Sequence, residues 1–243
     1  MKKSLTAIGL SLVFVGSANA ANWGYEGSHG PEHWGEFASE CAQGKNQSPI
    51  DIHSATQAEL AKLQLDYQGK VVALTNNGHT LQTSIEGENV LTIDGKAFAL
   101  KQFHFHTPSE NHVDGKSYPL EAHYVHADEQ GNLAVVAVFF EQGKANPALA
   151  NLLENVPERD QNVAIRAPFD ANALIPSDKD YYRFNGSLTT PPCSEGVRWL
   201  VIKDPQSISA EQIAQFEHVM GENNRPVQPL NARMVLYQIT DVF

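Results

Sequence analysis

Short apolar or alternating runs recur along most of the chain. They lie at 71–74, 90–93, 97–106, 121–125, 133–140, 197–202 and 234–239. Turn sequences such as Asn76-Asn77-Gly78 and Asp94-Gly95 separate several of them. Short runs bounded by turn residues are typical of β-strands. The pattern therefore predicts a mainly β fold built on a large sheet.

Two segments carry helix signals instead. Asn146 can cap a helix that has Pro147 at its first position, and we expect this helix to run to about Asn155. Ser209 and Gln212 form a capping box that begins a second helix. Its apolar stripe and its stop signal are Ile213, Phe216, Met220 and Gly221.

Between these elements the chain has no low-complexity linker, internal repeat or charge block. Residues 21–243 are therefore expected to form one domain. The stretches 21–50 and 157–187 show neither the strand nor the helix pattern, so we expect them to be sparsely structured. In a compact domain, such stretches usually carry function or cover a core.

The first twenty residues have the layout of a secretory signal peptide. Lys2 and Lys3 precede an apolar run that is followed by the small residues at 17–20. This run is far shorter than the roughly 20 residues that a membrane-spanning helix needs. We expect cleavage after Ala20, which would leave a periplasmic or secreted protein with no membrane span.

Charge and cysteine content narrow the functional classes. The 243 residues include 28 acidic and 17 basic side chains, for a formal charge of -11. Removing two lysines with the signal peptide gives 15 minus 28, or -13. This balance excludes a general nucleic-acid binder, which needs a basic surface. In an oxidising compartment, Cys41 and Cys193 can form one disulfide or remain two separate buried thiols.

Histidines stand out at residues 102–106. In a strand, residues two apart share a face, so Gln102, His104 and His106 point one way. Phe103 and Phe105 point the other way, where we expect an apolar core. The two imidazoles would then face a cavity, where both can reach one metal ion.

A third ligand is expected from the next alternating strand. Glu121, His123 and Val125 share one face there, whereas His126 lies on the opposite face. Three neutral imidazoles with an open fourth position are what a catalytic zinc site needs. Gln102 and Glu121 each stand two residues before a ligand, so they suit the role of accepting its second ring N–H.

These residues alone leave other metal proteins open. His104 and His106 followed by Glu110 resemble the first motif of the cupin oxygenases, although the second cupin motif is absent downstream. A periplasmic zinc carrier with an inactive site would need the same three histidines.

Further motifs follow one another over nearly the whole mature chain. They lie at 23–25, 30–34, 46–52, 76–79, 102–106, 109–110, 121–123, 186–192 and 224–230. Together they resemble the α-class carbonic anhydrase family in its exported bacterial form. The resemblance implies a twisted, mostly antiparallel sheet of about ten strands with a few peripheral helices. It also implies a lyase that reversibly hydrates carbon dioxide to bicarbonate and a proton.

The resemblance implies roles for the residues around the metal. Zn²⁺ would be held by His104, His106 and His123, and zinc-bound hydroxide would attack carbon dioxide. Thr189 would accept a hydrogen bond from this hydroxide and pass its own proton to Glu110.

It also implies a proton route and a substrate pocket. His79 would be the proton shuttle. A water network would be ordered by Tyr25, Asn77 and Gln82. The apolar wall that receives carbon dioxide would be Val125, Val135, Leu188 and Trp199. Thr107 and Gln82 depart from the residues that some members carry. The remaining histidines are expected to be surface or structural residues, namely His29, His33, His53, His112, His126 and His218.

The resemblance finally implies that Cys41 and Cys193 are bonded, which would brace the loop that carries Thr189. It suggests cis peptide bonds at Ser48-Pro49 and Pro191-Pro192. The expected partners are carbon dioxide, water and bicarbonate, and a homodimer is permitted because bacterial relatives are often dimers.

Overall fold

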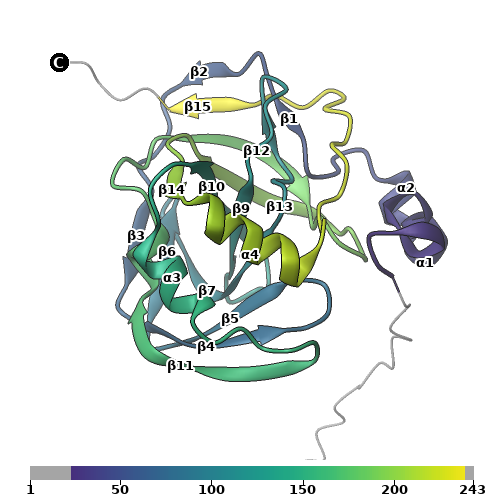
Figure 1. The fold of residues 1–243 in the computed structure, drawn as a ribbon. Coiled ribbons are helices and arrows are strands. Elements are labelled where there is room, and N and C mark those ends of the chain that lie inside the picture. The colour runs from purple at the N-terminus through teal and green to yellow at the C-terminus, as the bar shows by residue number, and fades with distance from the viewer. Residues whose placement is uncertain (1–22, 239–243) are drawn as a thin grey trace, which may run out of the picture.

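The computed structural model describes residues 23–238, and strands dominate them (Figure 1). A large sheet contains 13 strands. These are β2 (Thr56–Ala58), β3 (Gln64–Tyr67), β4 (Lys70–Asn76), β5 (Leu81–Glu86), β6 (Asn89–Ile93), β7 (Lys96–His106), β9 (Leu120–Ala127), β10 (Leu133–Gln142), β11 (Gln161–Asp170), β12 (Tyr181–Ser187), β13 (Glu195–Ile202), β14 (Gln206–Ile208) and β15 (Leu236–Gln238). A separate two-stranded sheet pairs β1 (Asp51–Ile52) with β8 (His112–Val113).

The large sheet runs in the order β11-β4-β5-β7-β9-β10-β13-β12-β15-β2. β14 pairs with β10 beside this path, and β3 pairs with β6, which also pairs with β7. Most neighbours are antiparallel, but β10 is parallel to β13 and β14, and β15 is parallel to β2. The expected mainly β class is confirmed. The continuous path has the expected ten strands, and β3, β6 and β14 bring the sheet to 13.

One expectation about the chain is wrong, because the stretch 157–187 is not sparsely structured. It holds β11, a 3-10 helix at Ala171–Leu174 and β12. β11 is an edge strand, and its register with β4 shifts between Ala164 and Phe169. Its side chains are mostly exposed, so no regular apolar alternation marks it in the sequence.

The stretch before residue 50 agrees better with the expectation. Its described part, which begins at residue 23, holds only short elements. These are the 3-10 helices Gly27–His29 and Pro31–His33 and the helices α1 (Trp34–Phe37) and α2 (Glu40–Gln43).

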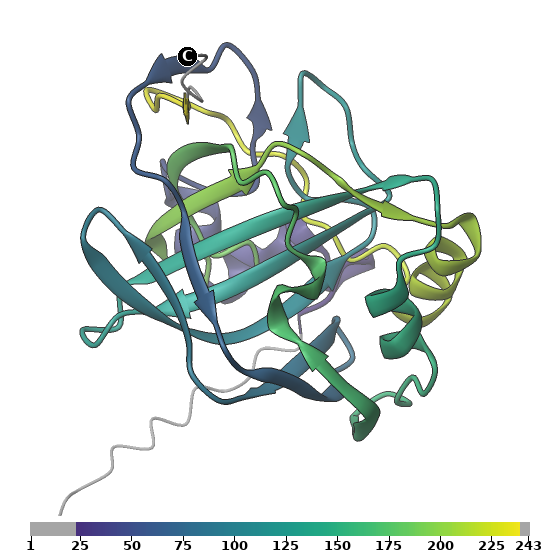
Figure 2. The ribbon, with the colours of Figure 1, turned by 90° about the vertical axis from the view of Figure 1, so that its left-hand side faces the viewer.

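Both expected helices are present. α3 (Pro147–Leu153) begins where the Asn146 side chain accepts hydrogen bonds from two backbone N–H groups, and it ends two residues earlier than expected. α4 (Ala210–Met220) has the expected capping box between Ser209 and Gln212, and it stops at Gly221, where φ is +64°. Figure 2 shows the two helices together at one side of the sheet.

The sheet separates two apolar cores. Phe103 and Phe105 of β7 are fully buried in the core that also holds Leu149 of α3 and Phe216 of α4. The other core contains Trp199 and lies on the opposite face of the sheet. The predicted division of β7 into an apolar face and a histidine face is therefore confirmed.

Candidate metal centre

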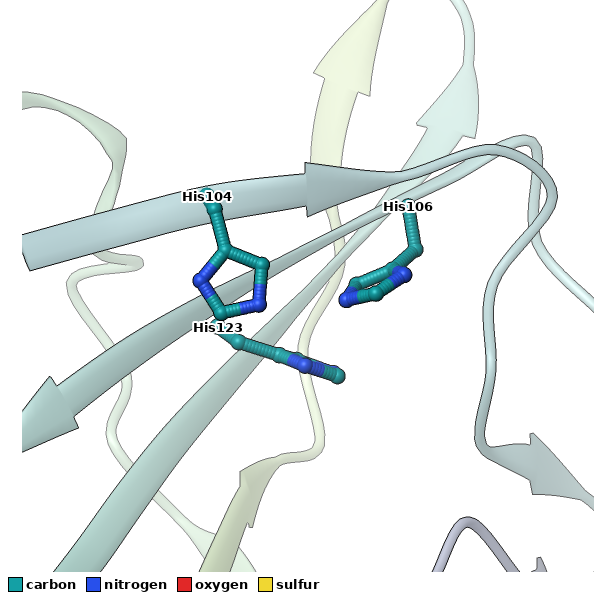
Figure 3. A group of neighbouring side chains, drawn as sticks. All are labelled: His104, His106 and His123. Carbon is teal, nitrogen blue, oxygen red and sulfur yellow. The ribbon is translucent and has the colours of Figure 1, made fainter. Parts of the chain in front are cut away.

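Three histidines from adjacent strands converge at one point (Figure 3). His104 and His106 come from β7, and His123 comes from β9, where it pairs directly with His104. One ring nitrogen from each lies within 4.8 Å of the others. The structure thus brings together the three residues that alternation and resemblance select as metal ligands.

Hydrogen bonds to the second ring nitrogens orient two of these imidazoles. His104 Nδ1 lies 2.9 Å from Gln102 Oε1, and His106 Nδ1 lies 2.7 Å from the backbone oxygen of Asn223. A carbonyl oxygen can only accept, so the proton of His106 resides on Nδ1. The lone pair on Nε2 is then free to bind a metal.

Glu121 faces the third imidazole and fixes the chain segment beside it. Its Oε1 lies 3.0 Å from His123 Nε2, a close contact whose angle falls short of a hydrogen bond. Its Oε2 accepts hydrogen bonds from the backbone N–H groups of Glu110 and Asn111, at 2.7 and 2.9 Å. The carboxylate favours a proton on Nε2 and leaves Nδ1 of His123 for a metal.

Burial makes the three imidazoles neutral bases. It lowers the pKa of His104 and His123 well below the usual value, and it lowers the pKa of His106 as well. His106 Nε2 is buried and has no hydrogen-bond partner within residues 23–238. A buried polar atom without a partner is costly, and a metal ion would provide one. Three neutral imidazole nitrogens are a donor set that suits zinc.

Glu110 lies beside the cluster. Its Oε2 is 3.5 Å from His106 Nε2 and 3.8 Å from His123 Nδ1, and its Oε1 accepts a hydrogen bond of 2.9 Å from the backbone N–H of Arg225. Burial raises the pKa of Glu110 well above its usual value. The Arg225 hydrogen bond and the Thr189 side chain lower that pKa in part. A cation at the centre would favour the ionised carboxylate further.

An apolar row runs across the sheet next to the histidines. Val125 stands two residues after His123 on β9 and pairs with Val135 of β10, which pairs with Trp199 of β13. Val135 is 2% exposed and Trp199 is 1% exposed. Leu188 packs against the same core. The residues expected to form the substrate wall therefore lie together, and Val125 is two residues along β9 from the expected metal ligand His123.

The loop that carries Thr189 is tied to the N-terminal segment. Cys193 is bonded to Cys41 of α2 across 152 positions, with the Cα atoms 5.0 Å apart. The backbone oxygen of Cys193 also accepts a hydrogen bond of 3.0 Å from Gln47 Nε2. Thr189 itself is only 5% exposed. The X-Pro bonds in the cis form are the expected Ser48-Pro49 and Pro191-Pro192, and also Thr107-Pro108.

A cavity of about 150 Å³ touches both His79 and the histidine cluster. Tyr25, Asn77 and Gln82 are in its lining, together with Trp23. The His79 ring stacks on Trp23, with centroids 3.9 Å apart and planes inclined by 12°. The residues expected to order water thus share one cavity with the expected shuttle.

The environment of His79 favours the neutral form of its imidazole. Partial burial lowers its pKa, and the nearby charge of Arg159 lowers it further, whereas Asp160 raises it. An imidazole with a lowered pKa releases a bound proton readily near neutral pH.

The sequence reasoning missed Asn223 and Arg225. Asn223 accepts from His106 through its backbone and donates from Nδ2 to the backbone oxygens of His79 and Phe105, at 2.9 and 3.0 Å. Arg225 is 2% exposed, and its backbone N–H reaches Glu110. Their only signal was the motif at 224–230, which overlaps Arg225 and begins one residue after Asn223.

The other histidines do not join the cluster within the described chain. His126 is fully buried, with Nε2 2.6 Å from the Tyr67 hydroxyl and Nδ1 3.2 Å from the backbone oxygen of Ala134. The rest are exposed or partly exposed, namely His29, His33, His53, His112 and His218.

Comparisons with known proteins agree over most of the chain. A family model described as eukaryotic-type carbonic anhydrase matches residues 29–239. A Pectobacterium carotovorum protein named carbonic anhydrase is 49% identical over 244 residues, which cover 98% of this chain and 100% of that protein. A Neisseria gonorrhoeae protein of the same name is 47% identical over 223 residues, covering 90% of this chain and 88% of that one. The solved structure titled Photobacterium profundum alpha-carbonic anhydrase has a TM-score of 0.87 and 58% identity, covering 88% of this chain and 99% of that one.

Proposed function

The chain belongs to the eukaryotic-type carbonic anhydrase family, and from this premise we propose that it hydrates carbon dioxide reversibly to bicarbonate and a proton. As a member of this family it is a carbonate dehydratase, a lyase. The observation that carries the proposal is the three-histidine cluster, in which His106 and His123 are buried and His104 is half-buried, with an apolar row two residues along the strand from His123. The cluster supplies a metal site, and the row supplies a seat for a small apolar substrate.

In this proposal, His104, His106 and His123 hold Zn²⁺. When bound, zinc lowers the pKa of coordinated water to about 7, a value established for carbonic anhydrases as a class. The protein's contribution is orientation. Gln102 and the Asn223 backbone fix two of the rings, and Glu121 faces the third.

Thr189 and Glu110 orient the attacking oxygen. Thr189 donates a hydrogen bond from its hydroxyl group to the Glu110 carboxylate, so the threonine oxygen is left to accept a hydrogen bond from the attacking group. This arrangement turns a lone pair of that group toward the substrate carbon. The effect of Thr189 on the pKa of Glu110 and the Arg225 hydrogen bond that fixes Glu110 support these roles.

The apolar row receives carbon dioxide. The substrate is small and uncharged, so contact with Val125, Val135, Leu188 and Trp199 costs it little hydration. Bicarbonate is charged and gains no such benefit, which helps it to leave the same wall.

His79 carries the proton out. The cavity lined by Tyr25, Asn77 and Gln82 has room for ordered water between the cluster and His79. The lowered pKa of His79 suits an acceptor that must pass its proton on to buffer.

We also propose export to the periplasm or beyond. The Cys41–Cys193 disulfide supports an oxidising compartment. The signal peptide at 1–20 lies outside the described residues, as does the start of the proposed domain at 21–243. Within residues 23–238, no helix is long and apolar enough to cross a membrane. A homodimer remains part of the proposal.

Carbon dioxide hydration measured with and without a chelator tests the proposed function. Purified protein with one bound zinc should hydrate carbon dioxide, lose the activity on chelation and regain it with zinc. His104→Ala should lower zinc content and activity together, whereas the exposed residue change His53→Ala should alter neither. Protein that holds one zinc and shows no hydration above a buffer blank would refute the enzyme and favour a zinc carrier.

A further inference from the structure

A second cavity lies on the far face of strands β12 and β13. Its volume is about 570 Å³, and it lies between the β6–β7 turn, the β9–β10 loop and the β12–β13 pair. Arg198 lines it, whereas the next residue on β13, Trp199, belongs to the core beside the metal centre. Successive strand residues point to opposite faces, so the sheet separates this cavity from the proposed reaction site.

Positive charge is in excess in this cavity. Lys96, Arg183 and Arg198 line it together with a single carboxylate, that of Asp94. Asp94 is already engaged, since Arg183 donates to its two oxygens at 2.9 and 2.5 Å. Within the described chain, Lys96 and Arg198 have no ion pair closer than 4.0 Å. Lys96 and Arg198 therefore lack a direct ion-pair partner, although both interact electrostatically with Asp94 and Lys96 also does so with Asp128.

The cations are held in place by structured elements. The β6–β7 hairpin turns through Asp94 and Gly95, both with positive φ, at 52° and 69°. The Arg198 guanidinium lies over the ring of Phe98, with Cζ 5.4 Å from the centroid, and Phe98 is fully buried. Stacking on an aromatic face leaves the N–H groups of arginine free to bind an anion.

Neutral amides complete the lining. Asn46, Asn132 and Asn185 each line the cavity, and Asn185 pairs with Arg198 across the two strands. The side-chain N–H groups of Asn46 and Asn132 donate to Glu195 and Asp128. Amide side chains both donate and accept, which suits hydroxyl groups. We propose that this cavity binds a small polyhydroxylated anion, a sugar that carries a phosphate or a carboxylate group. The cations would bind the charged group, and the amides would bind the hydroxyls.

Titration calorimetry on the zinc-containing full protein tests this site. The probes are glucose 6-phosphate, glucuronate and uncharged glucose at matched ionic strength. We expect saturable binding of at least one of the two anions and much weaker binding of glucose. The anion that binds identifies the charged group that the site prefers.

Substitutions then locate the binding. Arg198→Gln should weaken anion binding tenfold or more. Lys96→Gln should weaken anion binding too, and because the Lys96 side chain is exposed, this change should not disturb folding. The matched control is Arg166→Gln, at an 83% exposed arginine that pairs with Glu154 elsewhere on the surface, and it should bind as the unmodified protein does.

Three outcomes would overturn the proposal. One is the absence of saturable binding for both anions, and another is glucose binding as tightly as they do. The third is unchanged affinity in both Arg198→Gln and Lys96→Gln, which would place the anion elsewhere, for instance at the histidine cluster. None of these residues belongs to the metal centre, so failure here leaves the proposed reaction unaffected.

Discussion

Acid should destabilise this protein through His126, a buried histidine on the face of β9 opposite His123. Burial lowers the pKa of His126 to about 4, from an ordinary value of 6.5, and the backbone contacts that oppose this are weaker. Its neutral form is well accommodated, with Nδ1 3.2 Å from the Ala134 oxygen and Nε2 2.6 Å from the Tyr67 hydroxyl. A protonated ring would lose its acceptor nitrogen for Tyr67 and place a charge in the core.

The sign and the size follow from the two pKa values. Above pH 6.5, the ring is neutral in the folded and unfolded chains, so His126 adds no pH dependence. Between pH 6.5 and about 4, only the unfolded chain binds the proton, so the free energy of unfolding falls as the pH falls. At about 1.36 kcal/mol per pH unit, the loss is about 2 kcal/mol at pH 5 and about 3 kcal/mol at pH 4.

Urea unfolding of the protein and of His126→Gln at several pH values measures this loss. A chelator in every sample removes any contribution from metal release, and the other titrating groups cancel in the difference between the two proteins. The variant should be the less stable at pH 7, because it loses packing and hydrogen bonds. The gap should narrow by about 2 kcal/mol at pH 5.

His53→Gln provides the control, because His53 has a 52% exposed side chain and no core contacts to lose. Its stability should follow that of the unmodified protein at each pH. If the gap between His126→Gln and the unmodified protein is the same at pH 7 and pH 5, the reasoning is wrong.

Three other substitutions probe the site and its frame. Changing Cys41 and Cys193 together to Ser should lower the free energy of unfolding by about 4–5 kcal/mol, because the bond closes a long loop; an unchanged urea midpoint would contradict this. Arg225→Gln should cost about 3 kcal/mol or more by the same measurement, since the buried guanidinium donates to three oxygens, and stability equal to that of the unmodified protein would show that these bonds contribute nothing. His79→Ala should slow turnover in weak buffer by about 10²-fold, with recovery on adding imidazole; unchanged turnover would mean that the proton leaves by another route.

Local pattern was enough to predict the elements that carry the ligands. Alternation along residues 102–106 puts His104 and His106 on one face, and the buried Phe103 and Phe105 mark the opposite face. The two helices could be predicted because a side chain at the start of each one caps its own backbone, and this interaction spans only a few residues. Such signals are short-range, and the sequence displays them directly.

Long-range contacts were harder to predict. The Asn223 oxygen that orients His106 is 117 positions away, and the Arg225 N–H that binds Glu110 is 115 positions away. A backbone group carries no residue-specific signal, so nothing in a local window identifies it as a partner. The prediction missed β11 for another reason. It is an exposed edge strand with a register shift, and such a strand needs no apolar periodicity.

His123 and Val125 lie two residues apart on β9, and this spacing has a consequence for which substitutions the protein can accept. Two residues along a strand span about 6.8 Å, so the backbone repeat sets the distance between the proposed metal ligand His123 and the proposed substrate wall at Val125. No loop has to close to set that distance. A larger or smaller side chain at Val125 or Val135 would resize the proposed seat for the substrate while leaving that distance, and with it the three imidazoles, unchanged. If these assignments hold, substitutions at the wall can change which substrate sizes fit without moving the histidine cluster.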